Sequence, residues 1–215
     1  MLNRIIAIFG VFSFFIGGTL FLYSSLNHGV LSLWALATGA FAGWLLSDVA
    51  TGTLHWFGDR FFHEDTPIVG SLFVFPFREH HVLPKKMTEH DFFELCGTSG
   101  LLVAIFWVVV YFVRGPQGDF WSYFSLFFGL FGFLTNLFHK WAHMEKLPAF
   151  VRFLQKSGLI LDPVTHDVHH QTYDKYYCVT HGHMNWILEK LQVFQTAEKL
   201  LFFLPRGEEE HEKPA

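Results

Sequence analysis

The chain has 215 residues, of which 51% are hydrophobic and 19% aromatic, whereas only 16% are charged. Average soluble domains carry about 25% charged residues, so this composition leaves little polar surface to face water. The formal net charge of −4 argues against a nucleic-acid-binding protein, which is expected to be basic, and 28 Phe with 7 Trp exclude a disordered chain.

Four apolar runs predict four membrane-spanning helices, because a bilayer core needs about 20 apolar residues in helical form. None of the runs contains a charged residue, and buried helices of a soluble protein would leave too little polar chain to cover all four. The first run is too long for the apolar region of a signal peptide and lacks a small-residue cleavage site, so we expect it to be retained. The runs are Ile5–Leu26, Val30–Ser47, Leu95–Val113 and Phe120–Phe138.

The positive charges predict the orientation of these spans. Four passes place residues 27–29 and 114–119 in short turns on one side and all other connecting segments on the opposite side. That opposite side carries 14 of the 15 Lys and Arg, and only Arg114 lies across the membrane from them. Because cytoplasmic loops are enriched in Lys and Arg, we expect both termini to be cytosolic.

We expect the chain to divide into three parts. Residues 1–47 hold two transmembrane helices, residues 48–189 form the main domain with transmembrane helices at about 95–138, and residues 190–215 form a C-terminal helix and a charged tail. The tail, residues 207–215, is expected to be disordered. The predicted fold is therefore an all-α integral membrane protein with four transmembrane helices and a cytosolic, helical, His-rich cap that binds metal.

Histidines are the most unusual feature of this composition. The chain has 14 His, and 13 of them fall on the predicted cytosolic side, most in patterned groups near the ends of the spans. Residues three or four apart lie on one face of a helix, about 5–6 Å apart, so such pairs can share a metal ion. The count suffices for about five ligands on each of two metals. The candidate ligands are His55, Asp59, His80, His81, His90, His139, His143, His166, His169 and His170.

The ligand types limit the choice of metal. The two cysteines, Cys96 and Cys178, are not spaced as a zinc finger requires. The pair His139 and His143 has Lys140 where a zinc metalloprotease needs its catalytic Glu, which argues against a membrane peptidase. Imidazole with a minority of carboxylate suits iron as well as zinc, and iron sites with open positions activate dioxygen. A di-iron centre beside a bilayer would abstract hydrogen from a C–H bond of a lipid chain.

Between Asp48 and Glu189 the chain resembles the lipid desaturases typified by plasmanylethanolamine desaturase, also called Kua proteins. The HxxHH motif alone is shared by many membrane desaturases and hydroxylases, but the combined set is specific. The residues that carry the resemblance are His55-Trp56 with Asp59, Pro67-Ile68-Val69-Gly70, Pro76-Phe77-Arg78-Glu79-His80-His81, Pro84, Thr88, His90-Asp91-Phe92, Glu94, Gly97, Thr135-Asn136, His139-Lys140-Trp141-Ala142-His143, Leu154-Gln155, His166 with His169-His170, Tyr177-Cys178 and Asn185.

The resemblance implies a di-iron membrane enzyme with O2 as co-substrate. Animal and bacterial members form the vinyl ether bond of plasmalogens from 1-O-alkyl (plasmanyl) phospholipid, and a plant relative desaturates an acyl chain near its carboxyl end. No flavin or haem motif is visible, so an external electron donor of the cytochrome b5-like or ferredoxin type is implied. The short chain without a retention signal favours a bacterial inner membrane over the endoplasmic reticulum.

Further residues near the ligands have expected supporting roles. Asn185 is a candidate weak or water-mediated ligand, and Asp91, Asp167 and Glu94 adjoin candidate ligands and can orient their imidazoles. Three aromatic residues are either walls of a substrate slot or members of an interfacial aromatic belt, namely Trp56, Phe92 and Trp141. His181 and His183 depart from the family pattern; they are either surface residues, which we expect, or additional groups that support the metal ligands.

Three other functions stay open. An acyl-lipid desaturase and a di-iron lipid hydroxylase would use nearly the same ligands, so sequence does not separate them from a plasmalogen-forming enzyme. A metal transporter is the non-enzymatic alternative. It should carry ionisable groups inside its spans, yet residues 95–113 and 120–138 contain none.

Overall fold

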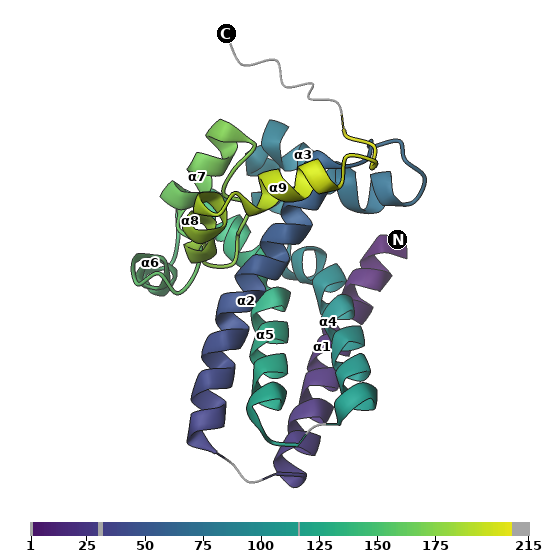
Figure 1. Ribbon diagram of the computed structural model, residues 1–215, viewed down its shortest axis with the longest axis vertical. Helices are drawn as coiled ribbons and strands as arrows, with labels where there is room; N and C mark the ends of the chain where they lie inside the picture. The colour runs from purple at the N-terminus through teal and green to yellow at the C-terminus, as the bar shows by residue number, and fades with distance from the viewer. Residues whose placement is uncertain (1, 30–31, 116, 208–215) are drawn as a thin grey trace.

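The computed structural model describes residues 2–29, 32–115 and 117–207, and within them the fold is helical. Four long helices lie side by side, and a cap of shorter helices covers one end of the bundle (Figure 1). The long helices are α1 (Leu2–Asn27), α2 (Leu33–Arg60), α4 (Phe92–Arg114) and α5 (Phe120–His143). The cap contains η1 (Gly70–Val74), α3 (Phe75–Val82), η2 (Pro84–Glu89), α6 (Ala149–Lys156), α7 (Pro163–Thr172), α8 (His183–Lys190) and α9 (Val193–Leu200).

The four long helices confirm the four predicted spans, and each is long and apolar enough to cross a membrane. With a rise of 1.5 Å per residue, even the 23 residues of α4 extend about 35 Å, against a hydrocarbon core about 30 Å thick. Two helices continue beyond their apolar runs into the cap. The α2 helix continues from Ser47 to Arg60, and α5 continues from Phe138 to His143.

Both ends of the described chain lie on the cap side of the bundle, as an even number of spans requires (Figure 1). The charged tail predicted from residue 207 lies outside the described residues from residue 208 onward. Among the described residues, the β-type pairing is limited to an isolated bridge between Phe61 and Arg206. This bridge ties the segment after α9 to the end of α2.

The bundle is packed through large aromatic side chains on its inner faces. The Phe14 ring of α1 stacks on Phe133 of α5 with centroids 3.7 Å apart, and Trp107 of α4 packs against Phe14. The Trp107 indole N–H donates to the Ser125 carbonyl oxygen at 2.8 Å, so its polar group is satisfied away from water. Outer faces of the helices carry exposed apolar side chains, as expected for helices that contact lipid.

The α1 and α4 helices approach closely at a pair of glycines. A Cβ atom added at Gly10 would overlap the Gly97 carbonyl oxygen, and one added at Gly97 would overlap the Ala7 backbone. Small residues permit this backbone approach between membrane helices. The contact fixes α1 against the cap-side end of α4.

We expect Gly97→Ala to destabilise the protein although alanine is the better helix former, because the added methyl group would push α1 away from α4. An overpacked contact of this kind costs about 1–3 kcal/mol. The matched control is Gly132→Ala in α5, where the nearest atom to the new Cβ would be Val103 Cγ2 at 3.9 Å. Thermal unfolding in detergent should show a lower midpoint for Gly97→Ala only, and equal midpoints for the two variants would contradict the proposed close approach.

Candidate metal centre

Four helices bring eight of the nine predicted histidines and Asp59 together above the bundle. The ends of α2 and α5 extend beyond the bundle into the cap, where α3 and α7 pack against them. Each helix contributes a pair or triplet in the spacing that the sequence predicted. The assembled residues are His55 and Asp59 from α2, His80 and His81 from α3, His139 and His143 from α5, and His166, His169 and His170 from α7.

The first group of imidazoles centres on His166. Its Nε2 atom lies 2.8 Å from that of His139, 2.9 Å from that of His143 and 3.0 Å from that of His170. His80 completes the group, and the five ligand atoms all lie within 4.8 Å of one another. Four or five nitrogens that face one point match the donor set of a metal site.

The second group surrounds the Asp59 carboxylate. Asp59 Oδ2 lies 3.2 Å from His81 Nε2, 3.3 Å from His55 Nε2 and 3.4 Å from His169 Nε2. His80 belongs to this group as well as to the first. The two groups are therefore adjacent and share a side chain, and together they could hold two neighbouring metal ions.

Backbone carbonyls fix the ring orientation of two imidazoles in the second group. His55 Nδ1 donates to the Tyr177 carbonyl oxygen at 3.0 Å, and His169 Nδ1 donates to the Lys175 carbonyl oxygen at 2.7 Å. When Nδ1 carries the proton, a neutral ring presents a lone pair at Nε2. Hydrogen bonds of this kind accompany nearly all metal-binding histidines.

The chemistry of the donor set fits a bound cation. Lone pairs on His55 and His169 point at a buried carboxylate, and like-signed groups at 3.3–3.4 Å repel one another unless a cation lies between them. His80 Nε2 and Asp59 Oδ1 are buried and have no hydrogen-bond partner in the described chain. These atoms are the ones that a pair of divalent ions would bind.

Burial keeps the cap histidines neutral, as metal binding requires. Desolvation, followed by the charge of neighbouring histidines, holds the pKa of His80 and His166 well below the usual value. The same causes lower the pKa of His170 to about 2. At neutral pH these rings therefore offer a lone pair rather than a proton.

His90 is the one predicted ligand that lies outside both groups. Its side chain is 46% exposed, and Nδ1 pairs with Glu94 Oε2 at 3.2 Å. The residue follows η2 and directly precedes Asp91, the N-cap residue of α4. Its carbonyl oxygen accepts a hydrogen bond from Lys140 Nζ at 2.6 Å. This loop ends at the membrane-facing edge of the cap instead of turning inward.

The predicted supporting residues mostly stabilise local structure. Asp91 caps α4, with Glu94 completing a reciprocal capping box and Arg4 pairing with Asp91. Asp167 is exposed and accepts a hydrogen bond from Gln171. The Asn185 side chain forms two hydrogen bonds with the Cys178 backbone. Its Oδ1 accepts from the Cys178 N–H at 2.8 Å, and its Nδ2 donates to the Cys178 carbonyl oxygen at 3.0 Å. Asn185 therefore holds the segment whose Tyr177 carbonyl orients His55.

An open cleft of about 520 Å³ gives access to the first group of histidines. The three aromatic residues expected to be either slot walls or members of an aromatic belt are not among its lining residues: Trp56 packs on Phe61 and Phe194, Phe92 packs against Phe93 and Phe133, and Trp141 packs between Phe138 and Phe150. Tyr173, which the sequence did not point to, is a cleft residue. The lining residues are His81, Pro84, Ala142, His143, Pro163, Val164, His166, Asp167, His170 and Tyr173.

Asp48 is a buried anchor that sequence reasoning missed. Its side chain is 0% exposed, and Oδ1 accepts hydrogen bonds from the backbone N–H groups of Thr180 (3.0 Å), His181 (3.0 Å) and Gly182 (3.1 Å). Oδ2 accepts from the Met184 N–H at 3.2 Å. A carboxylate of α2 thus caps the first turn of α8, whose own N-cap residue is a glycine.

The expectation that His181 is a surface residue is wrong. It is 3% exposed, its Nδ1 lies 3.2 Å from Asp48 Oδ2, and its ring stacks on Trp44 at 3.9 Å. The buried carboxylate 133 positions earlier in the chain explains the burial, because it gives the imidazole a charged partner. His183 is exposed, as expected, and its Nε2 donates to the Gly158 carbonyl oxygen at 2.7 Å.

We expect Asp48→Asn to destabilise the protein by about 1–3 kcal/mol, because an amide N–H₂ would replace an acceptor and leave a buried donor without a partner. The control is Asp65→Asn at an exposed position, which should stay within about 0.5 kcal/mol of the parent. The readout is the midpoint of thermal unfolding in detergent. An Asp48 variant as stable as the Asp65 variant would show that the carboxylate does not anchor this segment.

Comparison with known proteins identifies the family. The model of the lipid desaturase domain matches residues 44–211. The chain is 39% identical over 184 residues to a plasmanylethanolamine desaturase of Myxococcus xanthus, covering 82% of this chain and 65% of that protein. It is 33% identical over 197 residues to plasmanylethanolamine desaturase 1 of Mus musculus, covering 83% and 73%.

The chain is also similar to plant proteins. Fatty acid desaturase 4 of Arabidopsis thaliana, a chloroplastic protein, is 30% identical over 170 residues, covering 78% of this chain and 52% of the relative. The chain thus spans less than two thirds of the Myxococcus and Arabidopsis proteins. No solved structure matches it. The resemblance that the sequence predicted is confirmed, and the chain belongs to the lipid desaturase domain family.

Proposed function

We propose that this chain is a membrane di-iron lipid desaturase that forms the vinyl ether bond of plasmalogens from a 1-O-alkyl phospholipid. The observation that carries the proposal is the pair of adjacent, buried histidine groups that share His80 and enclose Asp59. In a member of the lipid desaturase domain family, such a centre favours a lipid substrate and a metal that activates O2. The names of the bacterial and mouse relatives, plasmanylethanolamine desaturase, favour the ether lipid.

The proposed ligand assignment follows the two groups. One iron would be held by His139, His143, His166 and His170, and the other by His55, Asp59, His81 and His169, with His80 between them. Mixed imidazole and carboxylate ligands suit iron. Bound iron supplies the activation of O2 that removes hydrogen from an unreactive C–H bond.

The overall reaction balances with an external donor. Two hydrogens leave adjacent carbons of the alkyl chain, and O2 takes up these, two electrons and two protons to give two waters. We propose that the electrons come from a cytochrome b5-like or ferredoxin-type protein. The chain's own residues fix the imidazoles through the Tyr177 and Lys175 carbonyls, keep them neutral by burial and limit water to the open cleft.

We also propose that the cap and both termini face the cytosol, since 14 of the 15 Lys and Arg lie on that side of the four spans. A bacterial inner membrane is the favoured location. The division of the chain into residues 1–47, 48–189 and 190–215 is kept as part of this proposal.

A second candidate is an acyl-lipid desaturase that acts near the carboxyl end of a phospholipid chain. The names of the Arabidopsis relatives, which are fatty acid desaturases, favour this candidate. The two substrates present the reacting carbons at nearly the same distance from the headgroup. The position of the new double bond in the product therefore distinguishes the two candidates.

Cells that lack plasmalogens and express this chain should form acid-labile vinyl ether lipid when they are fed an alkylglycerol. Mass spectrometry should find a phospholipid lighter by two hydrogens than its plasmanyl precursor. A product heavier by one oxygen would indicate a hydroxylase, and a new double bond confined to acyl chains would indicate the second candidate. Cells that carry the His139→Ala variant serve as the control and should form no product.

The purified protein should contain about two irons per chain, in line with carboxylate- and imidazole-bound di-iron centres. His166→Ala should lose most of this iron, because three other imidazoles converge on His166. His90→Ala should keep it, because His90 lies outside both groups. Elemental analysis provides the measurement, and an equal loss of iron in the two variants would overturn the assignment of ligands from this geometry.

A further inference from the structure

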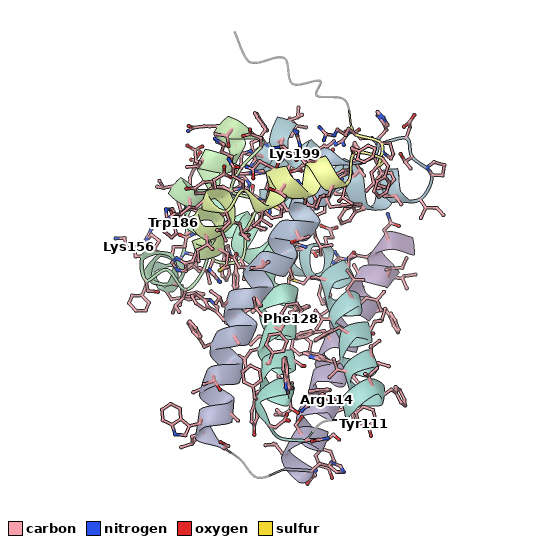
Figure 2. All side chains as sticks on the ribbon, viewed as in Figure 1. Tyr111, Arg114, Phe128, Lys156, Trp186 and Lys199 are labelled. Atoms are coloured by element: carbon pink, nitrogen blue, oxygen red, sulfur yellow. The ribbon has the colours of Figure 1, made fainter. Side chains whose placement is uncertain are left out.

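The short helix α6 has two unlike faces. Phe150 and Phe153, three residues apart and thus on one face, are 60% and 66% exposed. Val151 is buried against the bundle, and Arg152 and Lys156, four residues apart, lie on a further exposed face. Figure 2 shows Lys156 directed outward from this helix. An amphipathic helix with aromatic residues on one face and cations on the other is typical of the membrane interface.

The contacts of α6 give its depth relative to the spans. Val151 and Ile160 form one apolar cluster with Phe138 of α5, and the half-buried Phe131 and Leu134 of α5 pack against the same cluster. These α5 residues belong to the last turns of the apolar run that crosses the membrane. The α6 helix therefore lies beside the end of a span rather than on top of the cap.

A hydrogen bond from α2 supports the same depth. The Trp44 indole N–H donates to the carbonyl oxygen of Leu159, just after α6, at 3.1 Å. Trp44 lies inside the second apolar run, which ends at Ser47. In Figure 1, α6 accordingly lies beside the upper part of the bundle, below α7 and α8.

We propose that α6 is an in-plane membrane helix whose Phe150 and Phe153 side chains insert into the lipid bilayer. Continuity with the lipid-facing surface supports this occupant, because α5 and α2, which contact α6 and the residue Leu159 after it, carry the exposed apolar side chains Leu130 and Leu46 within the predicted spans. The cations Arg152 and Lys156 lie where phosphate groups of the cytosol-facing leaflet would meet them.

Membrane insertion of α6 would also set the height of the metal centre. Gln155 of α6 donates through Nε2 to the Leu161 carbonyl oxygen at 3.2 Å, and Asp162 then caps α7 through the Val164 and Thr165 N–H groups. The α7 helix carries His166, His169 and His170. An anchor in the lipid surface would thus end ten residues before His166, the first of the three histidines of α7.

Site-directed spin labelling tests the depth of α6 independently of metal content and activity. Single cysteines replace Phe153 and Arg152 in the full chain, which is reconstituted in phosphatidylcholine and phosphatidylglycerol vesicles. Collision rates with O2, which partitions into lipid, and with a water-soluble nickel chelate are then compared. Native Cys96 and Cys178 are buried, and the unmodified chain measures their background labelling.

Two reference variants calibrate the result. Leu130→Cys reports a lipid-facing position of a span, and Val164→Cys reports an exposed position on α7. We expect the Phe153 label to match Leu130, with a ratio of O2 to nickel collisions severalfold above that of Val164, and the Arg152 label to show a lower ratio than Phe153. A Phe153 ratio equal to that of Val164 would overturn the proposal. Low collision rates of the Phe153 label with both O2 and nickel would also overturn it, because they would show that a co-purified protein covers this face.

Discussion

The arrangement of the cap depends on one electrostatic conflict. Imidazole lone pairs and a buried carboxylate, which repel one another, are held close together. His55, His81 and His169 bring their Nε2 atoms within 3.4 Å of Asp59 Oδ2, and the four side chains are at most 6% exposed. An isolated buried carboxylate is costly, and neutral His55 and His169, whose Nδ1 protons are donated to carbonyls, cannot satisfy it. A bound cation would remove this conflict, and metal binding would then be coupled to the folding of the cap.

The membrane half and the cap solve different physical problems. In the bundle, aromatic rings and a close glycine contact provide packing where the hydrophobic effect gives no net attraction between helices. In the cap, the rigid ends of α2 and α5 carry four of the nine candidate ligands, and α3 and α7 carry the other five. Asp48 and Asn185 then hold the segment from Tyr177 to Met184, whose backbone orients His55. The precision of the site therefore comes from polar contacts that lie outside the ligand set.

Local periodicity explains how much of this could be predicted from sequence. The spans follow from uncharged runs, and the pairs His55 with Asp59 and His139 with His143 follow from i, i+4 spacing on helices that continue beyond the membrane. The sequence could not distinguish His90 from the other candidate ligands, because the position of His90 depends on the path of η2. Asp48 and His181 are far apart in the chain, and neither periodicity nor spacing encodes such a contact. The carbonyls of Tyr177 and Lys175 belong to the backbone, so no residue type in the sequence indicates that they accept hydrogen bonds from His55 and His169.

The height of the metal centre fits the position of the bond that the proposed reaction changes. His139 follows the fourth apolar run directly, and His55 lies eight residues beyond the second, about 12 Å along an ideal helix. The headgroup layer adds about 5–8 Å to each side of the hydrocarbon core, so the proposed centre would extend from the base of the headgroup layer, at His139, to just outside it, at His55. Carbons next to an ether or ester oxygen already lie at this level, whereas carbons in mid-chain would have to be drawn out of the bilayer. A small cap with an open cleft is therefore sufficient for desaturation near the headgroup, and an in-plane helix beside it would keep the site at that height.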